Sequence, residues 1–318
     1  MNLSTFEQLK SVRSDEMIVP SDEQLNQLHG ILLSMLKDID SWCEKSKITY
    51  MLSGGSVLGA MRHKGFIPWD DDIDIFMPRQ DYNIFIREFA QAFDGKYWID
   101  SPEFTPSVGI PIGRVRLEGT EARLYNDMAT DYDGIGIDIF VLENVPNNPV
   151  ARKLHGYRCL AAGLFFSCRR FARDKEFYLN LAEGSPSLKR ATKLKIALGR
   201  LASFWTVEKW AHHLVHVYSK CHKSDSEYIS CPSGRLHYFG EMYKRDDFLP
   251  PVKALFENQE FNLPHNPASY LRTLYGDWRR VPPESKRERH GYLRLDFGKY
   301  AQLNNALATT DTDKISRV

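Results

Sequence analysis

The stretch ITYMLSGGSVLGAMRHKGFIPWDDDIDIFM, residues 48–77, decides the fold of this chain. It begins with a β-rich apolar run, Ile48–Leu52, that stops at a turn of small residues, Ser53–Ser56. It ends with Asp70–Met77, in which aspartates alternate with apolar residues before Pro78 closes the run. The pattern predicts a strand, a glycine-rich turn with a short helix, and a second strand over about residues 72–77.

Two carboxylates in the second predicted strand, Asp72 and Asp74, need a partner. A carboxylate within an apolar strand is costly to bury unless it is paired or binds a metal. Side chains two residues apart on a strand share one face, so these two project together, ~6.5–7 Å apart. Mg²⁺ prefers oxygen ligands and is usually held by one or two carboxylates plus substrate phosphates. Asp138, in the apolar run 135–141, is the third carboxylate predicted for a two-metal site.

A solvated turn whose aspartates cap a helix is the alternative interpretation of the acidic cluster. It accounts for Asp70 or Asp71. It accounts poorly for Asp72 and Asp74, because these two alternate with apolar residues in a strand pattern.

The turn Ser53–Ser56 fits the other half of a phosphate-transfer site. Glycines let backbone N–H groups approach phosphate oxygens without a Cβ in the way. A Gly-Gly-Ser sequence alone is usually only a turn. The order of strand, Gly-Gly-Ser and then Asp-x-Asp on the next strand favours a phosphate site at Gly54, Gly55 and Ser56.

The surrounding segments alternate between helix and strand patterns. Ser21 and Gln24 form a predicted capping box ahead of an amphipathic helix with apolar residues from Leu25 to Cys43. Because helices and strands alternate over about residues 20–146, we expect an α/β or α+β fold with a mixed sheet. Beyond the strands already named, the pattern predicts a helix over 82–93 and strands over 97–99 and 110–117.

Charge divides the chain more sharply than its net charge of +1 suggests. Residues 150–223 carry 15 Lys and Arg against 4 Asp and Glu, whereas the remainder carries 27 against 37. The basic segment is therefore expected to meet an anionic partner, such as an acidic membrane surface. Its apolar periodicity predicts helices over 154–171, 188–201 and 207–217. We predict a catalytic core (1–149), a basic helical subdomain (150–230) and a C-terminal segment that completes the core and active site (231–318).

No targeting or membrane-spanning pattern is present in the sequence. The first 17 residues carry charges where a signal peptide needs an apolar core, and no apolar run approaches the ~20 residues that span a bilayer. A cytoplasmic protein, peripheral to the inner face of the membrane, is the expectation. The 5 cysteines are scattered and are expected to be reduced. Zinc is an alternative for one group, although helical histidines are more often surface residues: His212, His213, His216, Cys221 and His222.

Residues 52–74 closely resemble the LicD family of phosphotransferases, which have the nucleotidyltransferase fold. The resemblance continues at Asp138-Ile139-Phe140, Tyr270-Leu271 and Tyr275-Gly276-Asp277-Trp278. It implies that Asp72, Asp74 and Asp138 bind metal, and that Asp70 matches a further acidic position. The zinc-binding cysteines of some relatives have no counterpart here.

The resemblance also implies a reaction. Relatives transfer phosphocholine, or in fukutin-like members ribitol phosphate, from a CDP-linked donor to a glycan. We therefore expect Mg²⁺- or Mn²⁺-dependent transfer from a CDP-choline-like donor to a glycan or lipid-linked glycan, such as lipopolysaccharide or teichoic acid, with CMP released. Asp72 and Asp74 would bridge two metal ions, and Asp138 would activate the acceptor hydroxyl. An NMP-transferring enzyme acting on a small molecule or RNA, and a non-catalytic scaffold, are the alternatives; nucleic acid is not an expected partner.

Further residues are assigned to the donor. Cations near the acidic strand are predicted to neutralise donor phosphate, with Arg116 favoured over Arg114 in the strand pair, although a solvated face is their alternative role: Arg62, His63, Lys64, Arg114 and Arg116. Aromatic faces and one carboxylate suit a quaternary ammonium headgroup, and the residues predicted to form this site are Tyr275, Asp277 and Trp278. The alternative is that the rings only pack the C-terminal segment onto the core.

Overall fold

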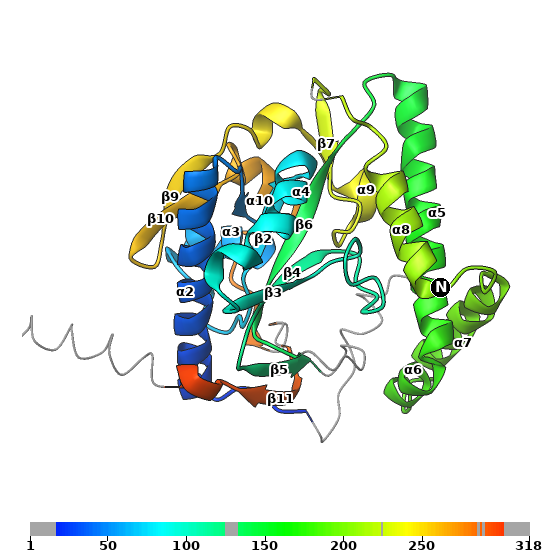
Figure 1. Cartoon of the computed structure of the whole chain (residues 1–318), viewed down its shortest axis with the longest axis horizontal. Helices are drawn as coiled ribbons and strands as arrows, with labels where there is room; N and C mark the ends of the chain where they lie inside the picture. The colour runs from blue at the N-terminus through cyan, green and yellow to red at the C-terminus, as the bar shows by residue number, and fades with distance from the viewer. Residues whose placement is uncertain (1–16, 125–132, 224, 285–286, 288–289, 302–318) are drawn as a thin grey trace, which may run out of the picture.

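A mixed β-sheet forms the centre of this protein in the computed structural model (Figure 1). The structure describes residues 17–124, 133–223, 225–284, 287 and 290–301, so the N-terminal segment searched for a targeting signal lies almost entirely outside it. The five main strands lie in the order β1, β2, β6, β4, β3, and β2 and β6 are parallel, whereas the other neighbours are antiparallel. This arrangement confirms the predicted mixed α/β fold. The strands are β1 (Met51–Leu52), β2 (Asp74–Pro78), β3 (Tyr97–Asp100), β4 (Gly113–Leu117) and β6 (Gly136–Asn144).

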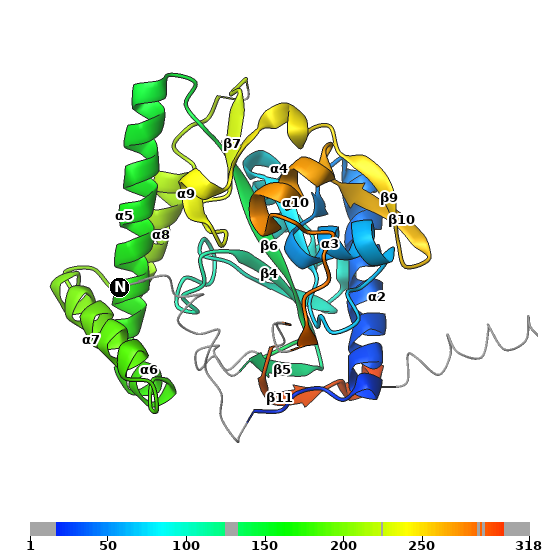
Figure 2. The same cartoon turned by 180° about the vertical axis from the view of Figure 1, so that it is seen from behind.

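Helices cover both faces of the sheet. In Figure 1 α2 (Asp22–Ser46) and α4 (Arg79–Glu88) lie in front of it, and in Figure 2 α3 (Gly54–His63) and α10 (Pro267–Tyr275) are in front. The predicted capping box starts α2, because the Ser21 side chain accepts from the Gln24 backbone N–H and the Gln24 side chain accepts from the Ser21 N–H. A short 3-10 helix, Ala90–Phe93, follows α4.

The second strand begins later than its sequence pattern predicts. It starts at Asp74 and not at Asp72. Asp74 pairs with Asp138 of β6 on one side and is hydrogen-bonded to Ser53 and Ser56 on the other. The Asp74 C=O accepts from the Ser53 N–H at 2.9 Å, and its N–H donates to the Ser56 hydroxyl at 3.0 Å. Asp72 therefore lies in the approach to the strand.

The basic segment is helical, as predicted. Its helices α5 (Pro149–Arg173), α7 (Pro186–Leu201) and α8 (Val207–Tyr218) match the three expected ones, and α6 (Lys175–Leu181) is additional. They pack around two small apolar clusters of their own and stand at one side of the sheet (Figure 1). Among the described residues, no helix is both long enough and apolar enough to cross a membrane.

The C-terminal segment returns to the main core. Phe256, Phe261, Tyr270 and Trp278 are buried in the same cluster as the strands of the sheet. Strand β11 pairs with β5, a contact between segments more than 160 residues apart that no local pattern indicates. The elements from β5 onward not yet named are β5 (Glu121–Leu124), β7 (Tyr228–Ser230), α9 (His237–Gly240), β8 (Met242–Lys244), the 3-10 turn Arg245–Asp247, β9 (Val252–Phe256), β10 (Gln259–Leu263), β11 (Tyr292–Asp296) and the 3-10 turn Gly298–Tyr300.

Candidate functional site

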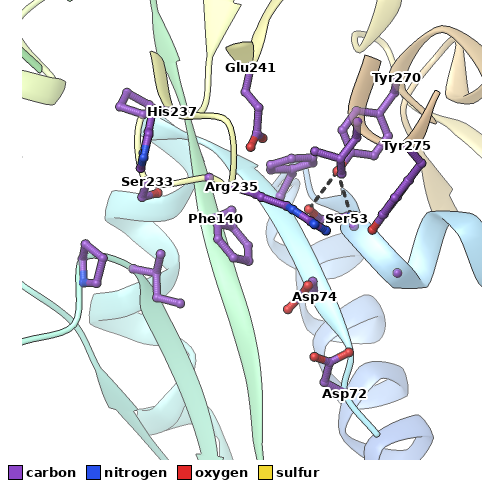
Figure 3. A pocket seen from close by; sticks show the side chains of 18 of the residues that line it. Ser53, Asp72, Asp74, Phe140, Ser233, Arg235, His237, Glu241, Tyr270 and Tyr275 are labelled. Atoms are coloured by element: carbon purple, nitrogen blue, oxygen red, sulfur yellow. Dashed lines mark hydrogen bonds between the residues drawn. The ribbon is translucent and has the colours of Figure 1, made fainter. Parts of the chain in front are cut away.

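The acidic residues meet where the parallel strands β2 and β6 begin. Asp74, the first residue of β2, stands opposite Asp138 of β6 in the strand register. Neighbouring strands lie about 4.8 Å apart, so the two side chains leave adjacent backbones at the same end of the sheet. Asp72 lies two residues earlier, and Figure 3 shows the carboxylates of Asp72 and Asp74 close together in the pocket. Asp70 lines the same pocket.

Mutual repulsion marks this group of carboxylates. The pKa of Asp72 is raised to about 6, first by burial and then by the negative charges of Asp71 and Asp138, against the opposing effect of His290 and Arg114. Burial, followed by the charges of Asp72, Asp138 and Asp70, raises the pKa of Asp74 well above its ordinary range. Burial and the like charges of the neighbouring carboxylates therefore both disfavour full ionisation of this set.

Two cations face the carboxylates. Arg114 pairs with Asp138, with Nη2 3.0 Å from Oδ2. The His290 Nδ1 lies 2.7 Å from Asp71 Oδ1 and 3.7 Å from Asp72 Oδ2. Burial lowers the pKa of His290, but the hydrogen bond and charge of Asp71 outweigh it, so the pKa lies well above its ordinary value.

The carboxylate and imidazole groups of this site suit a divalent cation. The three ligand atoms that lie closest together, however, are not those of the predicted trio. Oxygen-rich sites with an occasional imidazole suit Mg²⁺ or Mn²⁺. Within the described part of the chain, ligand atoms of Asp71, Asp72 and His290 lie within 4.8 Å of one another. The predicted trio is not gathered this closely, because Asp138 is bonded to Arg114 and Asp74 faces the start of α3.

The histidines of α8 are not gathered into a metal-binding group in the described residues. His213 instead lies against two indole rings, with centroids 5.1 Å from Trp205 and 5.6 Å from Trp210. His212 is exposed on the same helix. His213 is therefore a packing residue and His212 a surface residue in this structure.

The two glycines at the start of α3 make room for carboxylates. A Cβ on Gly54 would lie 2.9 Å from Asp74 Oδ2, and one on Gly55 would lie 2.5 Å from Asp70 Oδ2. Gly54 also has a φ of +50°, a left-handed conformation that favours glycine. Both line the pocket that the sequence assigns to donor phosphate.

Ser56 has a different role from the predicted one. It is buried, and its hydroxyl accepts the N–H of Asp74, so it fixes the start of β2 behind the pocket and does not line it. The Tyr270 hydroxyl performs a similar task from α10, since it accepts the Gly54 N–H at 2.8 Å. These two hydrogen bonds fix the position of the N-terminus of α3 relative to the start of β2 and to α10.

Of the predicted phosphate-binding cations, Arg62 lies in the pocket and the others do not. Arg62 lines it and donates to the Trp278 C=O at 3.1 Å. Lys64 is exposed, in the left-handed residue that ends α3. The structure gives Arg116 other partners than the predicted donor phosphate. It is buried, with Nε 2.7 Å from Asp100 Oδ2, and it also donates to the Gly134 C=O. Its charge is already neutralised, and Arg114 is the strand arginine beside the carboxylates.

The predicted headgroup residues Tyr275, Asp277 and Trp278 all line the pocket. Burial and then the charges of Asp70 and Asp74 raise the pKa of the Tyr275 hydroxyl well above its ordinary value, so this side chain is electrostatically coupled to the acidic group. The guanidinium of Arg279 lies over the Trp278 ring, 4.4 Å from its centroid, so one cation already occupies a face of this indole.

Sequence reasoning missed Arg235, which reaches into the pocket above Asp74 (Figure 3). Its loop is held by Glu241, whose carboxylate accepts the Leu236 N–H at 2.9 Å and would lie 2.3 Å from a Cβ on Gly234. Burial raises the pKa of Glu241 to about 7. Nothing in the local pattern around residue 235 indicates a site, because the contact joins segments about 160 residues apart.

One continuous cavity of about 1050 Å³ connects these groups. At one end are the carboxylates and the start of α3. The other end reaches the basic helices and is lined mainly by apolar side chains, including Ile112, Leu160, Leu164, Phe166 and Leu214. The volume lies at the upper end of the range of about 300–1,000 Å³ typical of small-molecule pockets.

Comparison with known proteins indicates a family for this site. The model of the LicD/FKTN/FKRP nucleotidyltransferase domain matches residues 47–148, which include the glycine turn and the carboxylates of both parallel strands. The lipopolysaccharide cholinephosphotransferase LicD of Haemophilus influenzae is 27% identical over 275 residues, covering 84% of this chain and 95% of the relative.

Two shorter similarities are to uncharacterized rickettsial proteins. The protein from Rickettsia prowazekii is 36% identical over 85 residues, which are 25% of this chain and 32% of the relative. The protein from Rickettsia typhi is 42% identical over 50 residues, 16% of each chain. These matches add no information on chemistry, whereas the long match extends the similarity beyond the catalytic region.

Proposed function

Because this protein belongs to the LicD family of phosphotransferases, we propose that it transfers phosphocholine from CDP-choline to a glycan such as that of lipopolysaccharide and releases CMP. The proposal takes the transferred group and the acceptor from the long similarity to the cholinephosphotransferase. The donor, the metal requirement and the leaving group are further parts of the proposal.

The observation that carries the proposal is the set of mutually repelling carboxylates beside the glycine start of α3. Asp72, Asp74 and Asp138 come from β2, its approach and the parallel strand β6, and Gly54 and Gly55 let α3 approach them closely. A helix N-terminus and backbone N–H groups favour phosphate oxygens, while the carboxylates favour a divalent cation. Such a site suits a diphosphate donor.

Asp72 and Asp74 are the residues that we propose hold Mg²⁺ or Mn²⁺, with Asp138 and His290 at the edge of the set. The cation supplies positive charge that offsets the diphosphate. Arg62 and Arg235 line the same cavity, and we assign them to the donor phosphates because a guanidinium presents donors in the geometry of phosphate oxygens.

The chemistry proposed for the chain is an in-line displacement at the choline-bearing phosphorus. The acceptor oxygen forms the new P–O bond, and the bond to the bridging oxygen of CMP breaks with its electron pair leaving on CMP. The hydroxyl proton passes to a carboxylate of the site, for which we assign Asp138. The other roles of the protein are to position the two substrates and to stabilise the charge of the transition state.

Metal dependence tests the proposed function. Purified protein with CDP-choline and a glycan acceptor is expected to release CMP with Mg²⁺ or Mn²⁺ and to stop after EDTA, with recovery when the metal is restored. CDP-ethanolamine, CDP-ribitol and CDP-glycerol serve as competing donors in the same assay. Release of CMP that continues unchanged in EDTA would contradict the assignment of the carboxylates.

Selection of choline is proposed to depend on the aromatic wall formed by Tyr275 and Trp278. A quaternary ammonium donates no hydrogen bond but is attracted to aromatic faces, with ~0.5–2 kcal/mol from each well-placed ring. Both side chains line the cavity on the α10 side, next to Asp277.

The substitution Trp278→Leu tests this wall. We expect it to reduce the preference for CDP-choline over CDP-ethanolamine by roughly 2- to 30-fold while CMP release continues. Trp42→Leu is the matched control, because Trp42 packs edge-on against Phe85 and Phe89 and does not line the cavity. An unchanged donor preference in Trp278→Leu would exclude the ring from headgroup recognition and leave the carboxylate site unaffected.

A further inference from the structure

We propose that one exposed face of α5 docks on an anionic lipid surface and thereby presents the cavity to an acceptor anchored in that surface. The docking itself is independent of the transferred group. The role of the docking in catalysis rests on the proposed function, because only an acceptor glycan that is carried by a lipid requires the enzyme to bind a lipid surface. The face is defined by Val150, Leu154, Tyr157, Leu164 and Phe165, and we call it the α5 stripe.

The α5 stripe is an apolar surface in an unusual position. The exposed fractions are 75% for Val150, 52% for Leu154, 64% for Tyr157, 36% for Leu164 and 38% for Phe165. Their spacings of three, four and seven residues place them on one side of a helix. Single exposed apolar residues need no explanation, but a continuous exposed row marks an interaction surface.

Packing of the neighbouring helices explains why the stripe is open. The opposite side of α5 is buried against α8 through Cys159, Ala162 and Phe166. Helix α7 packs against the C-terminal part of α5, where Lys195 donates to the Ser167 hydroxyl and a Cβ on Gly199 would lie 1.9 Å from the Cys168 oxygen. The stripe residues stay at least 36% exposed, although the Phe165 ring also stacks on Trp210 and Tyr157 lies edge-on to Phe239. From Val150 to Phe165 the stripe is roughly 22 Å long at 1.5 Å per residue.

Charge indicates which partner covers the stripe. Helix α5 has 25 residues with six Lys or Arg and no Asp or Glu. Lys153 and Arg158 are exposed and flank the stripe on its two sides. An apolar face bordered by basic residues is typical of helices that lie in the interface of an anionic membrane, and each basic residue contributes ~1 kcal/mol there. A second copy of the same helix would bring like charges together, which disfavours association of two stripes.

The stripe also borders the cavity. Leu164 belongs to both, because it is 36% exposed and it lines the cavity together with Leu160 and Gly163. In Figures 1 and 2, α5 lies on the side of the molecule away from α2, with α6 and α7 further out beside its lower part. Docking through α5 therefore brings the apolar end of the cavity to the lipid surface.

Vesicle binding by the purified full-length protein tests the inference. At low salt we expect retention on vesicles of phosphatidylcholine with one quarter phosphatidylglycerol, weak retention on pure phosphatidylcholine, and release as salt approaches 0.5 M. Lys153→Gln with Arg158→Gln should weaken the partition coefficient roughly 30-fold, from ~1 kcal/mol per basic residue. Leu154→Asp with Tyr157→Asp should weaken it at least as much, because it places two carboxylates in the stripe.

The matched control is Leu255→Asp with Val281→Asp, since these residues are 45% and 46% exposed and lie outside α5. The control should bind like the wild-type protein. Equal binding by the control and the Leu154/Tyr157 variant, or equal retention on neutral and anionic vesicles, would overturn the inference. So would a dimer in size-exclusion chromatography that only the stripe variant converts to monomer.

A second readout separates this inference from the proposed function. CMP release to a detergent-free, water-soluble glycan fragment should be equal in the wild-type protein and the Leu154/Tyr157 variant, because the stripe lies outside the carboxylate site. Transfer to the same glycan on a lipid in anionic vesicles should fall with binding. Vesicle binding without any CMP release would contradict the function and leave the docking surface standing.

Discussion

Asp74→Asn is expected to lose transfer activity by roughly a thousandfold or more, about 4 kcal/mol of transition-state stabilisation, with no loss of stability. The substitution removes the ligand charge and keeps the shape of the side chain. Asp74 faces the like charges of Asp70, Asp72 and Asp138, so loss of its charge relieves repulsion in the folded state. Rates of CMP release and the free energy of unfolding, measured on the same preparation, separate the two effects.

Asp94→Asn is the control for this substitution. Asp94 is exposed in a left-handed turn after the 3-10 helix, a position that asparagine also accepts, so activity should be unchanged. An active Asp74→Asn protein would remove the carboxylates from the reaction. A variant that is inactive because it is unfolded would contradict the repulsion argument.

Gly54→Ala is expected to lower activity about a hundredfold, because its new Cβ would stand 2.9 Å from Asp74 Oδ2 and displace that carboxylate. Part of any effect will be backbone strain, since Gly54 has a φ of +50°. That strain costs roughly 1 kcal/mol for alanine.

Gly95→Ala isolates the strain. Gly95 has a φ of +76°, and nothing lies within 4 Å of an added Cβ. Both variants should therefore lose a similar amount of stability, measured by chemical denaturation, whereas only Gly54→Ala should lose activity. Equal activity in the two variants would show that the approach of α3 to Asp74 is unimportant for the reaction.

The predictions that depended on local pattern agree best with the structure. The capping box of α2 and the helices of the basic segment are each set by residues a few positions apart, whereas the predicted turn Ser53–Ser56 is the N-cap and first residues of α3. The start of β2 was less accurate. It depends on two hydrogen bonds that the alternation of apolar residues does not indicate: the Ser53 N–H donates to the Asp74 C=O, and the Asp74 N–H donates to the Ser56 hydroxyl.

Side-chain partners across the sheet could not be predicted from one strand. Arg114 and Arg116 alternate correctly in β4, but the partner of each is decided by other strands. Asp138 of β6 pairs with Arg114, and Asp100 of β3 pairs with the buried Arg116, so neither partner could be read from the sequence of β4 alone. His290 and Arg235 were missed for the same reason, since each reaches the site from a segment more than 150 residues away along the chain.

The most direct test of the proposed function is to identify both products of one reaction. Protein, CDP-choline labelled in the choline methyl groups, Mg²⁺ and a lipopolysaccharide acceptor should give CMP and labelled acceptor in equal amounts, with an acceptor mass gain of one phosphocholine. The account predicts that no cytidine becomes attached to the acceptor. An acceptor that gains CMP, with labelled phosphocholine released, would show nucleotidyl transfer and contradict it.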